Sequence, residues 1–172
     1  MTGKGSAFEN HRKICDYVRD NPGSHLRRIS RDLDIDLGNL RHHLEVLERN
    51  GLVESKMDRN LKIYFATGLV EARSRTILPL LQQKRFRDVI LHIILNPRSA
   101  HREIADDLEL KPSTLSKYIG ILEDRDILRH ESHGRERLYF VTDERRIMEL
   151  LLAYRRSFWD KFVDNVLDIY FE

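Results

Sequence analysis

The residues best suited to chemistry are three polar side chains that stand close together, Asn39, Arg41 and His42. An Asn side chain can pair with the edge of adenine through two hydrogen bonds, and an Arg side chain can pair with guanine in the same way. Such contacts require a rigid element that carries the side chains to the base edges. The alternative is that Asn39 and Arg41 are ordinary solvated residues of a helix face.

A helix that presents these side chains is predicted by the leucines around them. The leucines recur at spacings of 3, 4 and 3, at Leu37, Leu40, Leu44 and Leu47, which predicts one inward face. The polar residues between them therefore point outward near the start of the helix. Glu45, one turn further on, disfavours phosphate at its own position but could accept a hydrogen bond from cytosine.

A second set of polar residues stands later in the chain, at the start of another predicted helix. The set is Ser113, Thr114, Ser116 and Lys117. Hydroxyl groups of this kind suit phosphate oxygens better than they suit unique recognition of a base. We therefore expect the first helix to read sequence and the second helix mainly to position the nucleic acid.

Two long stretches of the chain can be aligned with each other without a gap. The alignment places Asn21 of the first stretch on Asn96 of the second. Identical residues at this offset include Asn21-Pro22 and Asn96-Pro97, Ile29 and Ile104, Asp32-Leu33 and Asp107-Leu108, Leu47-Glu48 and Leu122-Glu123, and Tyr64-Phe65 and Tyr139-Phe140. Chance would not keep apolar positions in register over such a span. The chain is therefore predicted to contain two copies of one module.

Each copy is predicted to contain three helices followed by a β-hairpin. In the first copy, a helix over 8–20 ends at Asn21-Pro22-Gly23, because proline and glycine do not continue a helix. Ser24 is expected to cap the second helix, and Gly51 is expected to end the third. In the second copy, Pro112 is expected to open the third helix.

The hairpins are predicted by a change of period and of composition. Residues 52–56 and 62–66 are rich in β-branched and aromatic residues and are separated by a turn at 58–60, which is typical of two paired strands. The second copy repeats the pattern over 127–130 and 137–141. The order of elements in each copy predicts a helix-turn-helix followed by a β-wing.

The predicted fold class is mainly α with small β-wings (α+β): two tandem winged helix-turn-helix modules plus a long C-terminal helix. The expected boundaries are 8–68 for the first module, 69–78 for a linker helix, 79–142 for the second module and 143–171 for the last helix. Aromatic residues are enriched at interfaces, so the last helix is predicted to form a homodimer through Leu151, Phe158, Trp159, Phe162 and Tyr170. The alternative is that it folds back over the modules as part of their core.

Basic residues on the second helices and on the wings are predicted to contact phosphates or enter a minor groove. They are Arg27, Arg28, Lys56, Arg59, Lys62, Arg102, Arg135 and Arg137. The alternative for the wings is an ordinary solvated hairpin. The overall charge does not decide the matter, because 30 Lys and Arg stand against 28 Asp and Glu and the isoelectric point is near 8.7.

Composition excludes several classes of protein. Gly and Pro are too few for a collagen-like or low-complexity chain, and no apolar run approaches the roughly 18 residues of a membrane span. The first residues lack the apolar region of a secretory signal. We therefore expect a soluble, cytoplasmic protein with no membrane contact, and the predicted nucleic-acid contacts would make it nucleoid-associated.

Metal binding and catalysis are also disfavoured. A single cysteine, Cys15, excludes a multi-cysteine metal site. His42 and His43 are adjacent on a helix and point about 100° apart, and His130 and His133 span a strand end and a turn. The phosphate-loop, dinucleotide, zinc-protease and serine-hydrolase motifs are all missing, so no metal, no cofactor and no enzymatic activity are predicted.

The string from Asn21-Pro22-Gly23 through Leu40-Arg41-His42-His43-Leu44 to Asn50-Gly51-Leu52-Val53 resembles winged-helix transcription regulators of the ArsR/MarR type. The two copies together resemble archaeal tandem winged-helix regulators over residues 8–143. Asp126 departs from the pattern, because the family usually has glycine there. The resemblance implies a recognition helix in the major groove of double-stranded DNA.

The expected function is therefore a sequence-specific transcription regulator that binds double-stranded DNA, acts as a homodimer and is not an enzyme. Two alternatives stay open: a winged-helix scaffold for protein interactions, and a sequence-tolerant architectural chromatin protein. The residues do not indicate the target sequence, the direction of regulation or a small-molecule effector.

Overall fold

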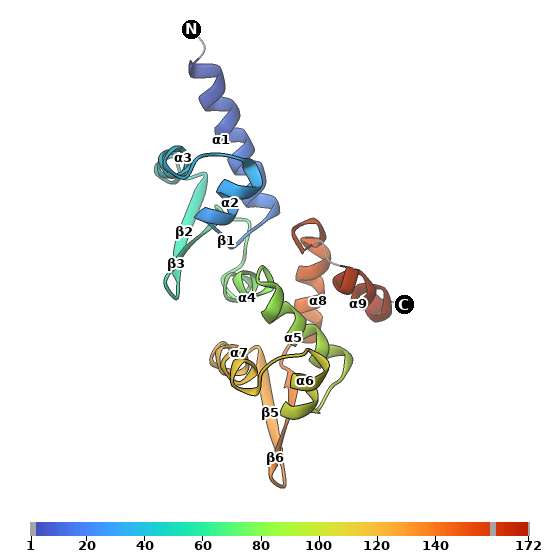
Figure 1. Ribbon diagram of the computed structural model, residues 1–172. Coiled ribbons are helices and arrows are strands. Elements are labelled where there is room, and N and C mark those ends of the chain that lie inside the picture. The colour runs from blue at the N-terminus through green and yellow to red at the C-terminus, as the bar shows by residue number, and fades with distance from the viewer. Residues whose placement is uncertain (1–2, 159–160, 172) are drawn as a thin grey trace. The chain divides into compact units, whose positions relative to one another are not determined.

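The computed structural model describes residues 3–158 and 161–171. The chain forms two compact units, Met1–Pro79 and Leu80–Glu172 (Figure 1). The elements of the first unit are α1 (Gly3–Asp20), β1 (Ser24–His25), α2 (Leu26–Leu33), α3 (Leu37–Arg49), β2 (Val53–Asp58) and β3 (Leu61–Ala66), and α4 (Ser74–Leu81) crosses the boundary between the units.

The turn after α1 depends on a glycine. The backbone N–H of Asn21 donates to the Tyr17 carbonyl and ends the helix. Gly23 then takes a φ of +80°, and a Cβ at this position would lie 3.1 Å from the backbone nitrogen of Pro79. Because other residues rarely adopt this backbone angle, glycine lets the chain enter β1 directly.

The sheet of the first unit has a strand that the sequence did not predict. β1 pairs antiparallel with β3, with Ser24 opposite Tyr64, so the strand order is β1-β3-β2. The prediction that Ser24 caps α2 is therefore wrong. His25 is the N-cap, and its Nδ1 accepts a hydrogen bond from the backbone N–H of Arg28 at 3.3 Å.

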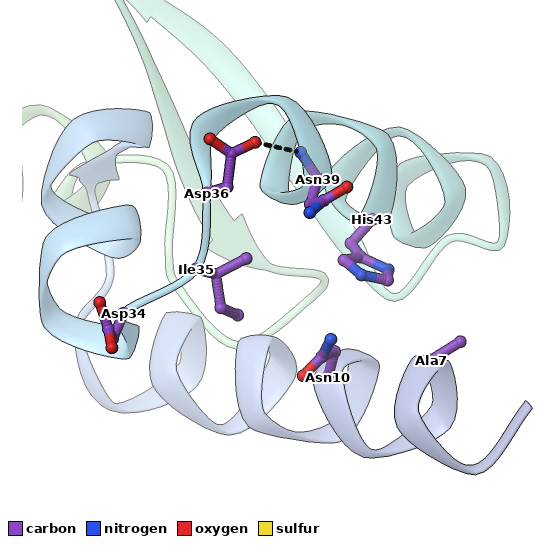
Figure 2. Close-up of a pocket in the computed structure, with 7 residues that line it drawn as sticks. All are labelled: Ala7, Asn10, Asp34, Ile35, Asp36, Asn39 and His43. Atoms are coloured by element: carbon purple, nitrogen blue, oxygen red, sulfur yellow. Dashed lines mark hydrogen bonds between the residues drawn. The ribbon is translucent and has the colours of Figure 1, made fainter. Parts of the chain in front are cut away.

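The turn between α2 and α3 fixes the start of α3. Asp34 ends α2 with a left-handed φ of 53°. Asp36 then caps α3, because its Oδ2 accepts hydrogen bonds from the backbone N–H groups of Gly38 at 2.9 Å and Asn39 at 3.2 Å. Figure 2 shows the bond to Asn39. A cap of this kind satisfies N–H groups that have no partner inside the helix.

The core of the first unit lies between α1, α2, α3 and the sheet. It consists of Ile14, Val18, Ile29, Leu40, Leu44, Leu47, Val53 and Tyr64, all of them buried. Three of the four leucines predicted to face inward do so, whereas Leu37 is 42% exposed. Leu37 is the first residue of α3.

The second unit repeats this order and then adds a helical C-terminal segment. Its elements are α5 (Lys84–Leu95), β4 (Ser99–Ala100), α6 (His101–Asp107), α7 (Pro112–Asp124), β5 (Leu128–His133), β6 (Glu136–Val141), α8 (Glu144–Ala153), a 3-10 turn over Arg155–Phe158 and α9 (Lys161–Phe171). Helix α7 begins and ends at the residues that are equivalent, in the repeat, to the first and last residues of α3. The same holds for β5 and β2, and for β6 and β3. The predicted α+β winged-helix fold is confirmed.

The linker helix differs from its prediction. It covers Ser74–Leu81 rather than 69–78, contains Pro79 in its interior, and is followed by α5 only at Lys84. Proline inside a helix costs about 3 kcal/mol because it lacks an N–H and crowds the preceding turn. The complete burial of Leu80 and Leu81 just after Pro79 offsets that cost, at roughly 1.5–3 kcal/mol for each side chain.

The C-terminal segment is not the single helix that its periodicity predicted. Helix α8 ends at Ala153, and α9 packs against both α8 and α5. The chain turns between α8 and α9 because both helices bury apolar residues, among them Leu151 on α8 and Val166 on α9. An ion pair of 2.7 Å between Arg155 and Asp164 closes the corner. One straight helix would leave the apolar face of α9 without these partners.

Candidate nucleic-acid interface

The three predicted base readers lie on the exposed side of α3. Asn39, Arg41 and His42 are all exposed, while Leu40 and Leu44 are buried beneath them. At about 100° per residue, Asn39 and Arg41 lie about 200° apart around the helix axis. They therefore stand on opposite flanks of the exposed face, with His42 between them.

Arg41 stands on the flank that faces the wing. A groove of about 580 Å³ lies there between α2, α3 and the hairpin. Its lining residues are His25, Leu26, Arg27, Arg41, Glu45, Asn60, Leu61, Lys62 and Tyr64. Three cations thus converge on one groove of the first unit, beside a single carboxylate that faces it, and the floor is partly apolar.

Asn39 stands on the flank that faces α1. A polar pocket of about 440 Å³ lies between α1, the α2–α3 turn and α3. Figure 2 shows Asn39 and His43 of α3 across from Asn10 of α1, with Asp36 at the helix start. The structure therefore does not bring Asn39 and Arg41 together at one point, as their closeness in sequence suggested.

Lys62 is held in place on the groove wall. Its Nζ donates to Glu48 Oε2 at 2.9 Å and lies 5.4 Å from the centre of the Tyr64 ring. The hydrogen bond to Glu48 raises the pKa of the Lys62 ammonium. Lys62 is thus a fixed positive charge with part of its hydrogen-bonding capacity already used.

The basic residues of α2 have two different roles. Arg27 is exposed and lines the groove. The side chain of Arg28 is only 19% exposed, and its Nε lies 3.5 Å from Asp32. Asp32 also accepts a hydrogen bond from the Tyr17 hydroxyl at 2.6 Å. Arg28, a predicted phosphate contact, is therefore positioned inside the module, whereas Arg27 is open to a ligand.

The wing of the first unit carries exposed cations and exposed apolar side chains. Lys56 and Arg59 are exposed, and Arg59 forms the tip with a φ of 54°. Met57 and Leu61 are 62% and 48% exposed beside them. Sequence reasoning missed these two residues, although an apolar residue next to a predicted hairpin turn is a signal that could have found them.

The equivalent residues of the second unit are also near the surface, but several are engaged with neighbours. Ser116 Oγ donates to the Pro112 carbonyl at 2.9 Å and lies 3.0 Å from Nε2 of His101. Arg102 pairs with Asp106 at 3.6 Å. The other predicted residues are placed as follows: Ser113, Lys117, Arg135 and Arg137 are exposed, and Thr114 is half-buried.

The predicted dimer contacts require a correction. Leu151 and Phe158 are buried inside the second unit, where Phe158 packs 5.8 Å from the guanidinium of Arg87, so neither can contact a partner. Phe162 is half-buried, and Trp159 lies outside the described residues. Tyr170 is 39% exposed and adjoins the exposed Phe171.

Two further observations bear on the class of site. Within the part of the chain that the structure describes, no group of three or more His, Cys, Asp and Glu side chains could hold a metal ion. Among residues 3–158 and 161–171, no helix has both the length and the apolar character needed to cross a membrane.

Residues 8–78 match the family model HTH_HVO_0163_N, described as an N-terminal HTH domain. The chain is also 32% identical over 136 residues to the uncharacterized HTH-type transcriptional regulator MJ1398 of Methanocaldococcus jannaschii. This similarity covers 78% of the chain and 34% of the regulator, so the chain spans about a third of the length of that relative. The match to the helix-turn-helix model thus covers less than half of the chain.

Two solved structures show a weaker likeness. FabT of Streptococcus pneumoniae in complex with DNA shares 24% identity over 67% of this chain and 75% of its own, with a TM-score of 0.32. The endosomal complex ESCRT-II (VPS22/VPS25/VPS36) shares 16% identity over 81% of this chain and 65% of its own, with a TM-score of 0.33. TM-scores this low say nothing about what the chain binds.

Proposed function

We propose that the chain is a transcription regulator that binds double-stranded DNA in a sequence-specific manner. The observation that carries the proposal is the groove between α3 and the wing of the first unit, into which Arg27, Arg41 and Lys62 face. The helix-turn-helix match and the similarity to a transcriptional regulator support DNA-binding regulation rather than enzymatic activity.

Helix α3 acts as the recognition helix in this proposal. The major groove admits one α-helix, whose outward residues then meet the base edges. His42 lies at the centre of the exposed face of α3, with Arg41 and Asn39 on its flanks. Arg41 would read guanine and Asn39 would read adenine, and each bidentate contact discriminates by about 1–3 kcal/mol.

Phosphate contacts supply most of the affinity. Arg27 on α2 and Lys56 and Arg59 on the wing are exposed cations on either side of α3. Each phosphate that they neutralise releases condensed counterions from DNA, which favours binding at low salt. The apolar side chains of Met57 and Leu61 beside the wing tip suit contact with the sugar walls of a minor groove.

A homodimer that acts at the nucleoid in the cytoplasm completes the proposal. A dimer would present two recognition helices to two half-sites about 34 Å apart, or a multiple of that distance. The exposed C-terminal end of α9, with Ile169, Tyr170 and Phe171, is the apolar surface proposed to join the two copies. The contribution of Ser113, Thr114, Ser116 and Lys117 to DNA positioning stays a prediction.

Selection from a pool of random duplexes tests the proposal. The purified chain is incubated with the pool at moderate salt, and the bound duplexes are amplified and sequenced. Enrichment of a shared motif is the expected result. Salt-sensitive binding without a motif would instead indicate an architectural protein, and no binding at low salt would indicate a protein-interaction scaffold.

A further inference from the structure

We propose that the DNA affinity of this chain resides in the first unit, and that the matching face of the second unit does not lie on DNA. This inference rests on the proposed function and deepens it, and it argues against the prediction that Ser113, Thr114, Ser116 and Lys117 position DNA. Two copies of a DNA-binding module would ordinarily be expected to contact DNA in the same way. The formal charge of the equivalent stretches differs, because residues 24–66 carry 8 Lys and Arg against 7 Asp and Glu, whereas residues 99–141 carry 7 against 9.

The two units are similar enough to compare single positions. Ser24 pairs with Tyr64 across the first sheet, and Ser99 pairs with Tyr139 across the second. The hairpins also share their register, with Val53 opposite Ala66 and Leu128 opposite Val141. A residue and its counterpart at the repeat offset therefore occupy the same place in their units.

Carboxylates of the first unit are replaced by cations at two such places, Asp36 and Lys111, and Glu54 and Arg129, whereas cations are replaced by carboxylates at four. These four pairs are Arg28 and Glu103, Arg31 and Asp106, Arg49 and Asp124, and Lys56 and Glu131. At a fifth place Arg41, which lines the groove, is replaced by Ser116. Arg28 is turned inside its module, but Arg31, Arg41 and Lys56 are exposed on the helix before the turn, on the third helix and on the wing, which are the elements that approach DNA in this fold.

The cations that remain in the second unit are partly neutralised by these acids. Arg102 pairs with Asp106 at 3.6 Å, and Arg98 pairs with Glu131 at 2.9 Å. In the first unit, by contrast, no carboxylate of a described residue lies within ion-pair distance of Arg27 or Arg41. The equivalent residues Arg27 and Arg102 therefore differ: Arg27 has no carboxylate within ion-pair distance among the described residues, whereas Arg102 pairs with Asp106.

The wing of the second unit is also less suited to DNA than the wing of the first. Met57 and Leu61 are exposed beside the first wing tip, and their counterparts are Ser132 and Glu136. Double-stranded DNA carries about one negative charge per 1.7 Å of its axis. Carboxylates held against this charge density are repelled, and the loss grows when water is excluded from the contact.

Matched pairs of variants test the inference. One variant is Arg27→Ala with Lys56→Ala in the first unit, and the other is Arg102→Ala with Arg135→Ala on the same helix and wing of the second. All four residues are exposed, so circular dichroism should show both variants folded. The dissociation constant for a selected duplex is measured by fluorescence anisotropy over a series of salt concentrations.

The first-unit variant is expected to bind DNA at least about tenfold more weakly at moderate salt. Its slope of log affinity against log salt should be less steep by about two, because each lost phosphate contact removes about 0.9 from the slope. The second-unit variant is expected to keep the affinity within about twofold and the slope unchanged. An equal loss of slope in the second-unit variant would overturn the inference and leave the proposed function standing. Failure of the wild-type chain to bind any duplex would overturn both.

Discussion

His11 of α1 and His43 of α3 pack edge to face, with ring centroids 4.9 Å apart and an interplanar angle of 89°. Their counterparts in the second unit, Phe86 and Tyr118, make the same contact at 4.7 Å and 60°. The contact therefore joins α1 to α3 in the first unit and α5 to α7 in the second. In the first unit it is built from imidazoles, and His11 Nε2 and His43 Nδ1 are buried without a hydrogen-bond partner among the described residues.

This contact should make the first unit sensitive to acid. Burial lowers the pKa of the His43 imidazole, and the nearby His11 and His42 act in the same direction. An unfolded chain titrates its histidines near 6.5, so it binds the proton more tightly than the folded unit does. The resulting stabilisation is fully present above about pH 6.5 and is lost as the pH falls through the lowered folded pKa.

The second unit supplies the matched variant, His11→Phe with His43→Tyr. We expect the variant to lose less stability than the wild type between about pH 7.5 and pH 5.5, as measured by urea unfolding, with NMR titration of the His43 ring in the wild type as a direct check. Burial also lowers the pKa of His25, so some acid sensitivity should remain. An equal loss in both proteins would show that the histidine contact is not the cause.

The residues that follow α3 and α7 offer a second prediction. Gly51 follows α3 with a φ of 69°, and Asp126 takes a φ of 55° at the same place after α7. A left-handed backbone angle is unfavourable for a residue with a side chain. Asp126→Gly should therefore stabilise the second unit by about 0.5–1 kcal/mol, and Gly51→Asp should destabilise the first by a similar amount.

Thermal unfolding of both variants measures these changes. Asp126 also pairs with Arg129 at 3.0 Å, but both side chains are more than half exposed, and such pairs contribute little. Asp126→Asn is the control, because it removes the charge and keeps a side chain that tolerates this angle. A loss of stability in Asp126→Gly as large as the predicted gain would contradict the backbone explanation.

Arg41 offers a prediction about specificity. Arg41→Ala should weaken binding to the selected duplex by about 5- to 150-fold, which corresponds to about 1–3 kcal/mol. It should also broaden the preference at one base pair. Arg41→Lys keeps the charge but cannot form the bidentate contact, so it should preserve the salt slope and lose the preference. Repeating the selection with each variant measures both effects, and an unchanged motif would remove Arg41 from the base readers.

The proposed dimer surface can be tested without disturbing the core. Tyr170 and Phe171 are exposed at the end of α9, so Tyr170→Lys with Phe171→Lys should leave the fold intact and convert a dimer to a monomer. Asp168, also exposed, provides the control variant Asp168→Lys, which should stay dimeric. Sedimentation equilibrium distinguishes the two states. A wild-type chain that sediments as a monomer would reject the homodimer.

Much of the fold could be predicted because the internal repeat is strong and the recognition helices have a clear period. Helix α7 begins at Pro112 and ends at Asp124, which are the repeat counterparts of Leu37 and Arg49 at the two ends of α3. The short strand of Ser24 and His25 could not be predicted, since two residues are too few to show an alternation. Its position depends on the backbone of Tyr64, which is distant in sequence.

The parts that sequence reasoning missed depend on contacts between distant residues. The apolar stripe of the C-terminal segment keeps its helical spacing across the break, so the pattern could not show that α8 ends at Ala153. The pairing of Arg28 with Asp32 and Tyr17 likewise requires α1 beside α2. The separation of Asn39 from Arg41 follows from helix geometry and could have been predicted.

The central claim is that the exposed cations of the first unit bind DNA. The most direct measurement is a fluorescence anisotropy titration of the wild-type chain with a selected duplex and a shuffled duplex over a salt series. With Arg27, Lys56 and Arg59 engaged on phosphates, the slope of log affinity against log salt should be about −3 for each chain. The selected duplex should bind at least about 10³-fold more tightly than the shuffled one. Equal affinity for both duplexes, or a slope near zero, would contradict the account.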